Sequence, residues 1–144
     1  MSRTEIFLDT AYAIALSSST DEHHQKALVL ADQLEAGGTK LITTRAIILE
    51  IGNALSKPTY RKSAVELLES LEQDPSVEIV PITEELCGQA FELYRQRADK
   101  EWGMTDCISF IVMSERNLQE ALTTDKHFQQ AGFKALLRAT QEGV

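Results

Sequence analysis

The sequence has few of the features that mark secreted or membrane proteins. Its two cysteines, Cys87 and Cys107, form no CxxC motif and have no neighbouring histidine at metal-ligand spacing. We expect both to be small buried side chains in a reducing compartment. No apolar run approaches the ~20 residues of a membrane-spanning helix. The first five residues are charged early and lack the apolar core of a signal peptide. These absences predict a cytoplasmic protein that does not enter a membrane.

Proline, glycine and basic residues are also scarce. Three prolines and seven glycines in 144 residues exclude a collagenous or linker-like chain, and the length predicts a single domain over 1–144. The 14 basic residues are outnumbered by 22 acidic ones, and the formal net charge is −8. This balance argues against a broad electrostatic footprint for nucleic acid. It leaves open an enzyme that meets phosphates through metal ions, because bound cations change the local field.

The most informative stretch lies near the N-terminus. Ile6, Phe7 and Leu8 form a short apolar run that predicts a buried strand, and Asp9 and Thr10 end it. A second apolar run, 11–16, predicts a helix. A carboxylate at the carboxyl end of a central strand points into the crevice where open α/β sheets bind ligands. Burying that charge is costly unless Asp9 is paired, hydrogen-bonded or bound to a metal.

The remainder of the chain alternates between strand and helix patterns. Strands are expected over 40–43, 77–82, 121–123 and 133–137, and helices over 20–36, 45–57, 60–72, 83–98, 106–116 and 126–131. Ser19 and Glu22 have the spacing of a capping box, and Thr105 is the expected cap of the helix over 106–116. Pro58 is expected to end the helix over 45–57. This alternation predicts an α/β fold with a mostly parallel sheet covered on both faces.

Four acidic residues stand out by their positions in these elements. Asp9 and Asp125 each follow a short strand, Asp106 opens a helix, and Glu50 lies mid-helix beside small alanines. In a parallel sheet Asp9 and Asp125 emerge at the same edge. Like charges so close raise one another's pKa, and Mg²⁺ or Mn²⁺ is the usual compensation. Taken singly, Asp106 has an alternative role as a helix-start acid and Asp125 as a turn residue.

The order and context of these acids carry a family resemblance. The segments concerned are 7–10 with Asp9, 44–55 with Glu50, 102–109 with Asp106, and 122–128 with Asp125. Together they resemble the PIN-domain nucleases, in particular the VapC-type toxins of bacterial toxin–antitoxin pairs, over about residues 6–137. The resemblance implies a three-layer α/β/α sandwich with a central, mostly parallel sheet of four to five strands. It also implies Mg²⁺ or Mn²⁺ in an acidic pocket and endonucleolytic cleavage of RNA.

The resemblance also suggests roles for individual residues. Asp9, Glu50, Asp106 and Asp125 occupy the acidic positions of the family and are the expected catalytic and metal-binding set. Asp9 and Asp106 are expected as principal ligands, Glu50 as a ligand of a second metal or the group that orients the attacking water, and Asp125 as a ligand through water. Thr10 and Ser109 are expected to orient carboxylates as hydrogen-bond donors.

Three further residues are candidates for substrate contact. Lys126 and His127 flank Asp125 and either meet phosphate or lie on the surface at a helix start. Trp102 either stacks on a base or packs against the edge of the core.

The expected partners are an RNA substrate, an antitoxin protein and a second copy of the chain, since the helices over 21–36 and 60–72 have large apolar faces. The alternatives are a non-catalytic PIN-like binding or scaffold module, and a PIN nuclease of RNA processing outside a toxin–antitoxin pair.

Overall fold

A five-stranded parallel sheet runs through the centre of the molecule. The computed structural model describes residues 4–138. The strands are β1 (Glu5–Leu8), β2 (Lys40–Thr44), β3 (Val77–Val80), β4 (Glu120–Leu122) and β5 (Lys134–Ala135). Their order in the sheet is β3-β2-β1-β4-β5, and every neighbouring pair is parallel. The predicted mostly parallel sheet of four to five strands is therefore confirmed.

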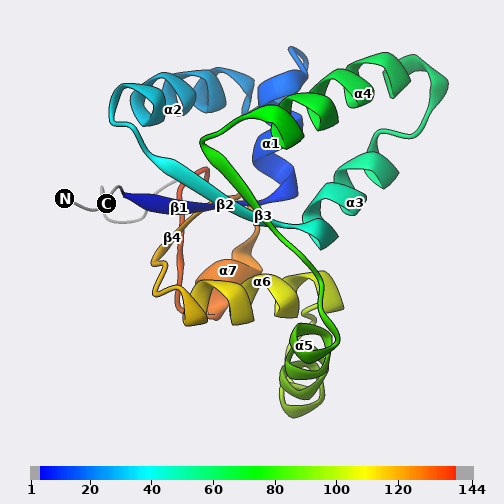
Figure 1. The fold of residues 1–144 in the computed structure, drawn as a ribbon, viewed down its shortest axis with the longest axis vertical. Coiled ribbons are helices and arrows are strands. Elements are labelled where there is room, and N and C mark those ends of the chain that lie inside the picture. Colours follow the sequence, from blue (N-terminus) through cyan, green and yellow to red (C-terminus); the bar gives the residue numbers. More distant parts are fainter. Residues whose placement is uncertain (1–3, 139–144) are drawn as a thin grey trace.

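Helices cover both faces of this sheet and complete a three-layer α/β/α sandwich. The helices are α1 (Thr10–Ser17), α2 (His24–Ala36), α3 (Arg45–Ala54), α4 (Pro58–Gln73), α5 (Glu84–Gln96), α6 (Met104–Glu115) and α7 (Lys126–Gln130). The first four lie on one side of the sheet and the last three on the other, with α5 at the outer end of its layer (Figure 1). Within the part of the chain described, no helix combines the length and the hydrophobicity needed to cross a membrane.

The first strand lies in the middle of the sheet and is buried on both faces. Phe7 is fully buried, Leu8 is nearly so, and the Phe7 ring packs 6.1 Å from that of Phe128 on α7. A strand enclosed by helices on both sides needs an unbroken apolar run, as 6–8 provides. The hydroxyl of Thr43 on β2 donates to the Leu8 carbonyl at 2.8 Å and so satisfies a buried polar atom at the end of β1.

Two helix starts differ from the sequence-based expectation. Helix α2 begins at His24 rather than near Thr20. Residues 20–23 form a turn instead, in which the Asp21 carboxylate accepts the backbone N–H of His23 at 2.8 Å. The expected capping box is therefore wrong. Pro58 begins α4 instead of ending α3, which already stops at Ala54. Proline suits the first helical position, where its missing N–H costs no hydrogen bond.

The start of α6 also differs, and this difference affects the acids. Gly103, not Thr105, is the N-cap, and the Asp106 carboxylate accepts the Gly103 backbone N–H at 3.1 Å. Asp106 thus lies at the third helical position and helps to fix the helix start. Cys107 is buried as expected, whereas Cys87 is exposed on α5, contrary to expectation.

Candidate active site

The carboxyl ends of β1 and β4 bring distant parts of the chain together. Phe7 pairs with Ala121 and Leu8 with Leu122 in the parallel ladder, and the Asp9 backbone N–H donates to the Leu122 carbonyl at 3.3 Å. Asp9 directly follows β1, and Asp125 follows β4 by three residues. The structure therefore places both acids at one edge of the sheet, as the parallel arrangement requires.

Asp9 is the buried member of the site, with 8% of its surface exposed. Its Oδ2 accepts a 2.6 Å hydrogen bond from the hydroxyl of Thr123, which is itself fully buried. The pKa of Asp9 is raised to about 7, chiefly by burial and to a smaller extent by the charges of Glu50 and Asp106, while the hydrogen bonds from Thr123 and the Thr10 backbone act in the opposite direction. Without a nearby cation, a substantial share of Asp9 is thus protonated at neutral pH.

Glu50 reaches the site from α3 and is held by the residue that follows Asp9. The Thr10 hydroxyl, at the start of α1, donates a hydrogen bond to Glu50 Oε1. This contact joins two segments forty positions apart in the sequence. The hydrogen bond holds the Glu50 carboxylate against the start of α1, which is consistent with the predicted role of Thr10.

The outer part of the site consists of Asp106, Asp125 and His127. His127 Nδ1 lies 3.0 Å from Asp106 Oδ2 and 3.4 Å from Asp125 Oδ1, while the His127 backbone N–H donates to Asp125 Oδ1 at 2.8 Å. One ligand atom from each of the three residues lies within 4.8 Å of the others. Asp9 and Glu50 are close enough to interact by charge but fall outside this tight group.

The donor set fits a divalent cation. Four carboxylates share one edge of the sheet, and the most buried of them has its pKa raised by burial and by two of the others. Neutralising such a cluster calls for positive charge, and carboxylate oxygens are the ligands that Mg²⁺ and Mn²⁺ prefer. A histidine nitrogen within reach of two of the acids is compatible with Mn²⁺ or another transition metal.

The remaining predicted site residues are Ser109, Trp102 and Lys126, and their hydrogen bonds and packing do not involve the four acids. The Ser109 hydroxyl donates to the Thr105 carbonyl one turn earlier at 3.0 Å, so no contact in the structure supports its predicted role with a carboxylate. Trp102 is 6% exposed, its ring packs edge-on against Phe110 at 4.9 Å, and its Nε1 donates to Gln130 at 3.0 Å. Lys126 is exposed at the first position of α7.

Thr123 is the residue that sequence reasoning missed. Its hydroxyl donates to Asp9 and accepts the backbone N–H of Asp125 at 3.0 Å, so one side chain connects the buried and the outer acids. A threonine at the end of a strand is common, and this sequence contains no local signal for the contact. His127, for which the sequence leaves open a phosphate contact or a surface position, lies against Asp106 in the structure.

The chain belongs to the PIN-domain family, whose model matches residues 6–134. It is similar to the 23S rRNA-specific endonuclease VapC20 of Mycobacterium tuberculosis, with 28% identity over 129 residues that cover 89% of this chain and 95% of the relative. The predicted resemblance to PIN-domain VapC-type toxins is confirmed by these matches.

Solved structures agree with this assignment. The crystal structure of M. tuberculosis VapC20, described as a Sarcin–Ricin loop cleaving toxin, superposes with a TM-score of 0.77 at 26% identity, over 89% of this chain and 95% of that one. VapBC2 of Rickettsia felis, bound to a DNA fragment from its promoter, gives a TM-score of 0.66 at 12% identity, over 92% and 97% of the two chains. FitAcB of Neisseria gonorrhoeae gives 0.64 at 20%, over 90% and 95%. The last two likenesses concern the fold alone.

Proposed function

We propose that this protein is a divalent-metal-dependent endoribonuclease that acts as the toxin of a toxin–antitoxin pair in the cytoplasm, with 1–144 working as one nuclease domain. The observation that carries the proposal is the meeting of Asp9, Glu50, Asp106 and Asp125 at one edge of the sheet in a PIN-family chain. The 28% identity to an rRNA-specific endonuclease supports RNA as the substrate and ribosomal RNA as the first candidate.

The positions of these residues support the roles proposed for them. Asp9 and Asp106 would provide the principal carboxylate ligands of a divalent cation, and Asp125 a further one. The cation would supply charge neutralisation at the phosphate and a more acidic bound water. Glu50, held by the Thr10 hydroxyl, either holds a second metal or orients the attacking water. Thr123 keeps Asp9 and Asp125 in register, since it is hydrogen-bonded to both.

The test is cleavage of RNA by the purified protein. Ribosomal RNA and a Sarcin–Ricin stem-loop are incubated with Mg²⁺, with Mn²⁺ and with EDTA, and the cleavage products are mapped by primer extension. We expect cleavage with at least one metal, none in EDTA, and loss of cleavage in Glu50→Gln. Glu69→Gln, which neutralises an exposed acid on α4, is the matched control. RNA left intact under every metal condition would refute the proposal.

The antitoxin is the protein partner in this proposal. Apolar side chains exposed on α2 and α4, among them Val29 at 54% and Tyr60 at 47%, are consistent with a surface that a partner covers. A short reading frame next to this gene is the place to look for it. We expect its product to co-purify with the toxin, suppress RNA cleavage and restore growth of cells that express the toxin. Unhindered growth at high expression of the toxin alone would contradict the toxin role.

A homodimer is also part of the proposal. Self-association would cover some of the exposed apolar side chains. Multi-angle light scattering over a range of protein concentrations measures the mass directly. A mass of one chain at every concentration would remove the dimer from the proposal and leave the nuclease activity untouched.

A further inference from the structure

An open cavity of about 570 Å³ lies beside the acidic site, between the end of α5, the loop over 97–103 and the start of α6. We call it the α5–α6 groove. It is lined by Phe91, Tyr94, Arg95, Arg97, Ala98, Lys100, Glu101, Trp102, Gly103 and Met104. The backbone N–H of Gly103, one of these lining residues, donates to the Asp106 carboxylate. The groove therefore adjoins the helix start that carries one of the acids proposed to cut RNA.

The residues that line this groove include more bases than acids, unlike the chain as a whole. Three bases, Arg95, Arg97 and Lys100, line it against one acid, Glu101, whereas acids outnumber bases by 22 to 14 in the complete sequence. A second cavity, between α1, α2 and α4, is lined by the acids Glu35 and Asp74 and by no base. A third, beside Tyr60, has no charged lining residue. The excess of bases beside the acidic site favours an anionic ligand.

The bases of the groove are held in place but can still donate hydrogen bonds to a ligand. The Arg97 guanidinium lies 5.1 Å from the centre of the Trp102 ring, and its Nε and Nη2 each donate to Asp99 at 3.0 Å. Lys100 Nζ lies 4.0 Å from the same carboxylate, whose side chain is 59% exposed. Arg95 is paired with Glu92, which lies three residues earlier on α5. Exposed ion pairs such as these are weak. Arginine has five N–H donors, so Arg97 keeps three for a phosphate even while Asp99 positions it.

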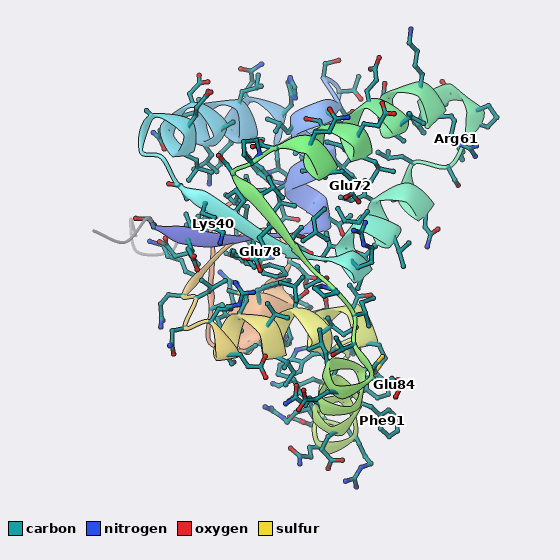
Figure 2. All side chains as sticks on the ribbon, in the orientation of Figure 1. Lys40, Arg61, Glu72, Glu78, Glu84 and Phe91 are labelled. Atoms are coloured by element: carbon teal, nitrogen blue, oxygen red, sulfur yellow. The ribbon has the colours of Figure 1, made fainter. Side chains whose placement is uncertain are left out.

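Two exposed aromatic rings complete the groove. Phe91 is 54% and Tyr94 is 46% exposed, and their ring centres are 6.4 Å apart with planes 26° from parallel. Phe91 lies on the outer end of the molecule (Figure 2). Trp102, by contrast, is covered by Arg97 and packed on Phe110, so it forms the floor of the groove. Exposed aromatic faces along a cationic track are the features that bind single-stranded nucleic acid by base stacking.

We propose that the α5–α6 groove holds the unpaired RNA strand next to the bond that is cut, with its phosphates on Arg97 and Lys100 and a base on Tyr94. This proposal rests on the proposed nuclease function and adds the surface that positions its substrate. A protein surface that bound its partner by apolar contact alone would not explain three bases around the rings. The chain as a whole carries a net charge of −8, which disfavours RNA binding, so a local cluster of bases is more necessary.

The test separates phosphate contacts from base stacking. Binding of a fluorescein-labelled single-stranded RNA of mixed sequence is measured by anisotropy, in EDTA to prevent cleavage, over a series of salt concentrations. Lys100→Ala should lower the slope of log Kd against log salt by about 0.7, the value for one phosphate contact on a single strand. Arg61→Ala, on α4 at the other end of the molecule from Phe91, is the matched control and should leave the slope unchanged (Figure 2).

Stacking is tested by the aromatic variants. Tyr94→Ala should weaken RNA binding by about 5- to 150-fold with an unchanged salt slope, the range for loss of one aromatic platform. Tyr94→Phe keeps the ring and should bind as the unaltered protein does. The proposal is overturned if Lys100→Ala keeps the original slope, or if Tyr94→Ala binds RNA as tightly as Tyr94→Phe.

Three further outcomes decide which of the two proposals fails. If Tyr94→Ala lowers the mass measured by light scattering while the RNA affinity per chain stays the same, the rings join two copies and the groove proposal is wrong. If the protein cleaves RNA with metal but the groove variants bind normally, the nuclease function stands and the groove proposal fails. RNA binding with the expected responses but no cleavage under any metal supports the groove and refutes the nuclease.

Discussion

The inner and outer parts of the site are built in opposite ways. Asp9 is buried, receives one side-chain hydrogen bond from Thr123, and has its pKa raised to about 7. Asp106 and Asp125 are half-buried and also serve as helix-start acids, at α6 and α7. The inner acid lowers the stability of the fold when it is charged, whereas the outer two contribute to it. Of the three acids, Asp9 should therefore show the largest change in protonation when a cation binds.

The largest expected effect is that of Asp9→Asn. RNA cleavage should fall by about 100-fold or more, because even the residues that merely support metal ligands are worth ~10–100-fold. At pH 8 in EDTA the same variant should be more stable than the unaltered protein by roughly 4 kcal/mol, since it removes a charge whose pKa is raised from 3.8 to about 7. Urea denaturation and RNA cleavage assays measure the two quantities. An unchanged or lowered stability would mean that burial of Asp9 is not costly.

The pH dependence of stability tests the same charge in the unaltered protein. Between about pH 4 and pH 7 the folded state holds the Asp9 proton that the unfolded chain has already lost. The free energy of unfolding in EDTA should therefore fall as pH rises through this window, by a total of roughly 4 kcal/mol from this group, and then level off. Asp9→Asn should lack this contribution, and saturating Mg²⁺ or Mn²⁺ should reduce it by favouring the charged form.

Thr123→Val breaks the connection between the inner and outer parts. Valine has the shape of threonine without the hydroxyl, so the Asp9 carboxylate loses its donor and the Asp125 N–H its acceptor. We expect a loss of about 1–3 kcal/mol in stability and a ~10–100-fold loss in cleavage. Thr43→Val is the control, because that buried hydroxyl bonds only the Leu8 carbonyl and should affect stability without a comparable loss of cleavage. Equal cleavage by both variants would show that Thr123 does not position the acids.

The smallest effect on stability is expected from Asp125, the N-cap residue of α7. Asp125→Ala removes the oxygen that accepts the His127 N–H at the start of α7, which should destabilise the protein by about 1 kcal/mol in thermal or urea unfolding. Asp125→Asn keeps a capping oxygen and should retain that stability. Asp125→Ala should thus lower the stability, whereas Asp9→Asn should raise it. A stabilised Asp125→Ala would contradict the distinction between the inner and outer parts of the site.

The sequence was sufficient for the parts of the site that depend on strand direction. Asp9 and Asp125 follow apolar strands, and parallel pairing alone brings them to one edge. Contacts made by ordinary residues in tertiary structure could not be predicted in this way. Thr123 looks like any strand threonine, and Gly103 caps α6 only because the Asp106 carboxylate reaches back to its N–H. Pro58 was misread because proline can equally follow one helix or begin the next.

The position of β1 at the centre of the sheet has a consequence for the timing of activity. Its neighbours are β2, made soon after it, and β4, which ends at Leu122. Until β4 has left the ribosome, Asp9 has neither Thr123 nor Asp125 beside it, and one edge of β1 has no strand to pair with. A nascent chain therefore cannot bring the four acids together during most of its synthesis. Strands that are far apart in the sequence, such as β1 and β4, pair slowly. A partner protein that is already present could therefore bind the toxin while it folds.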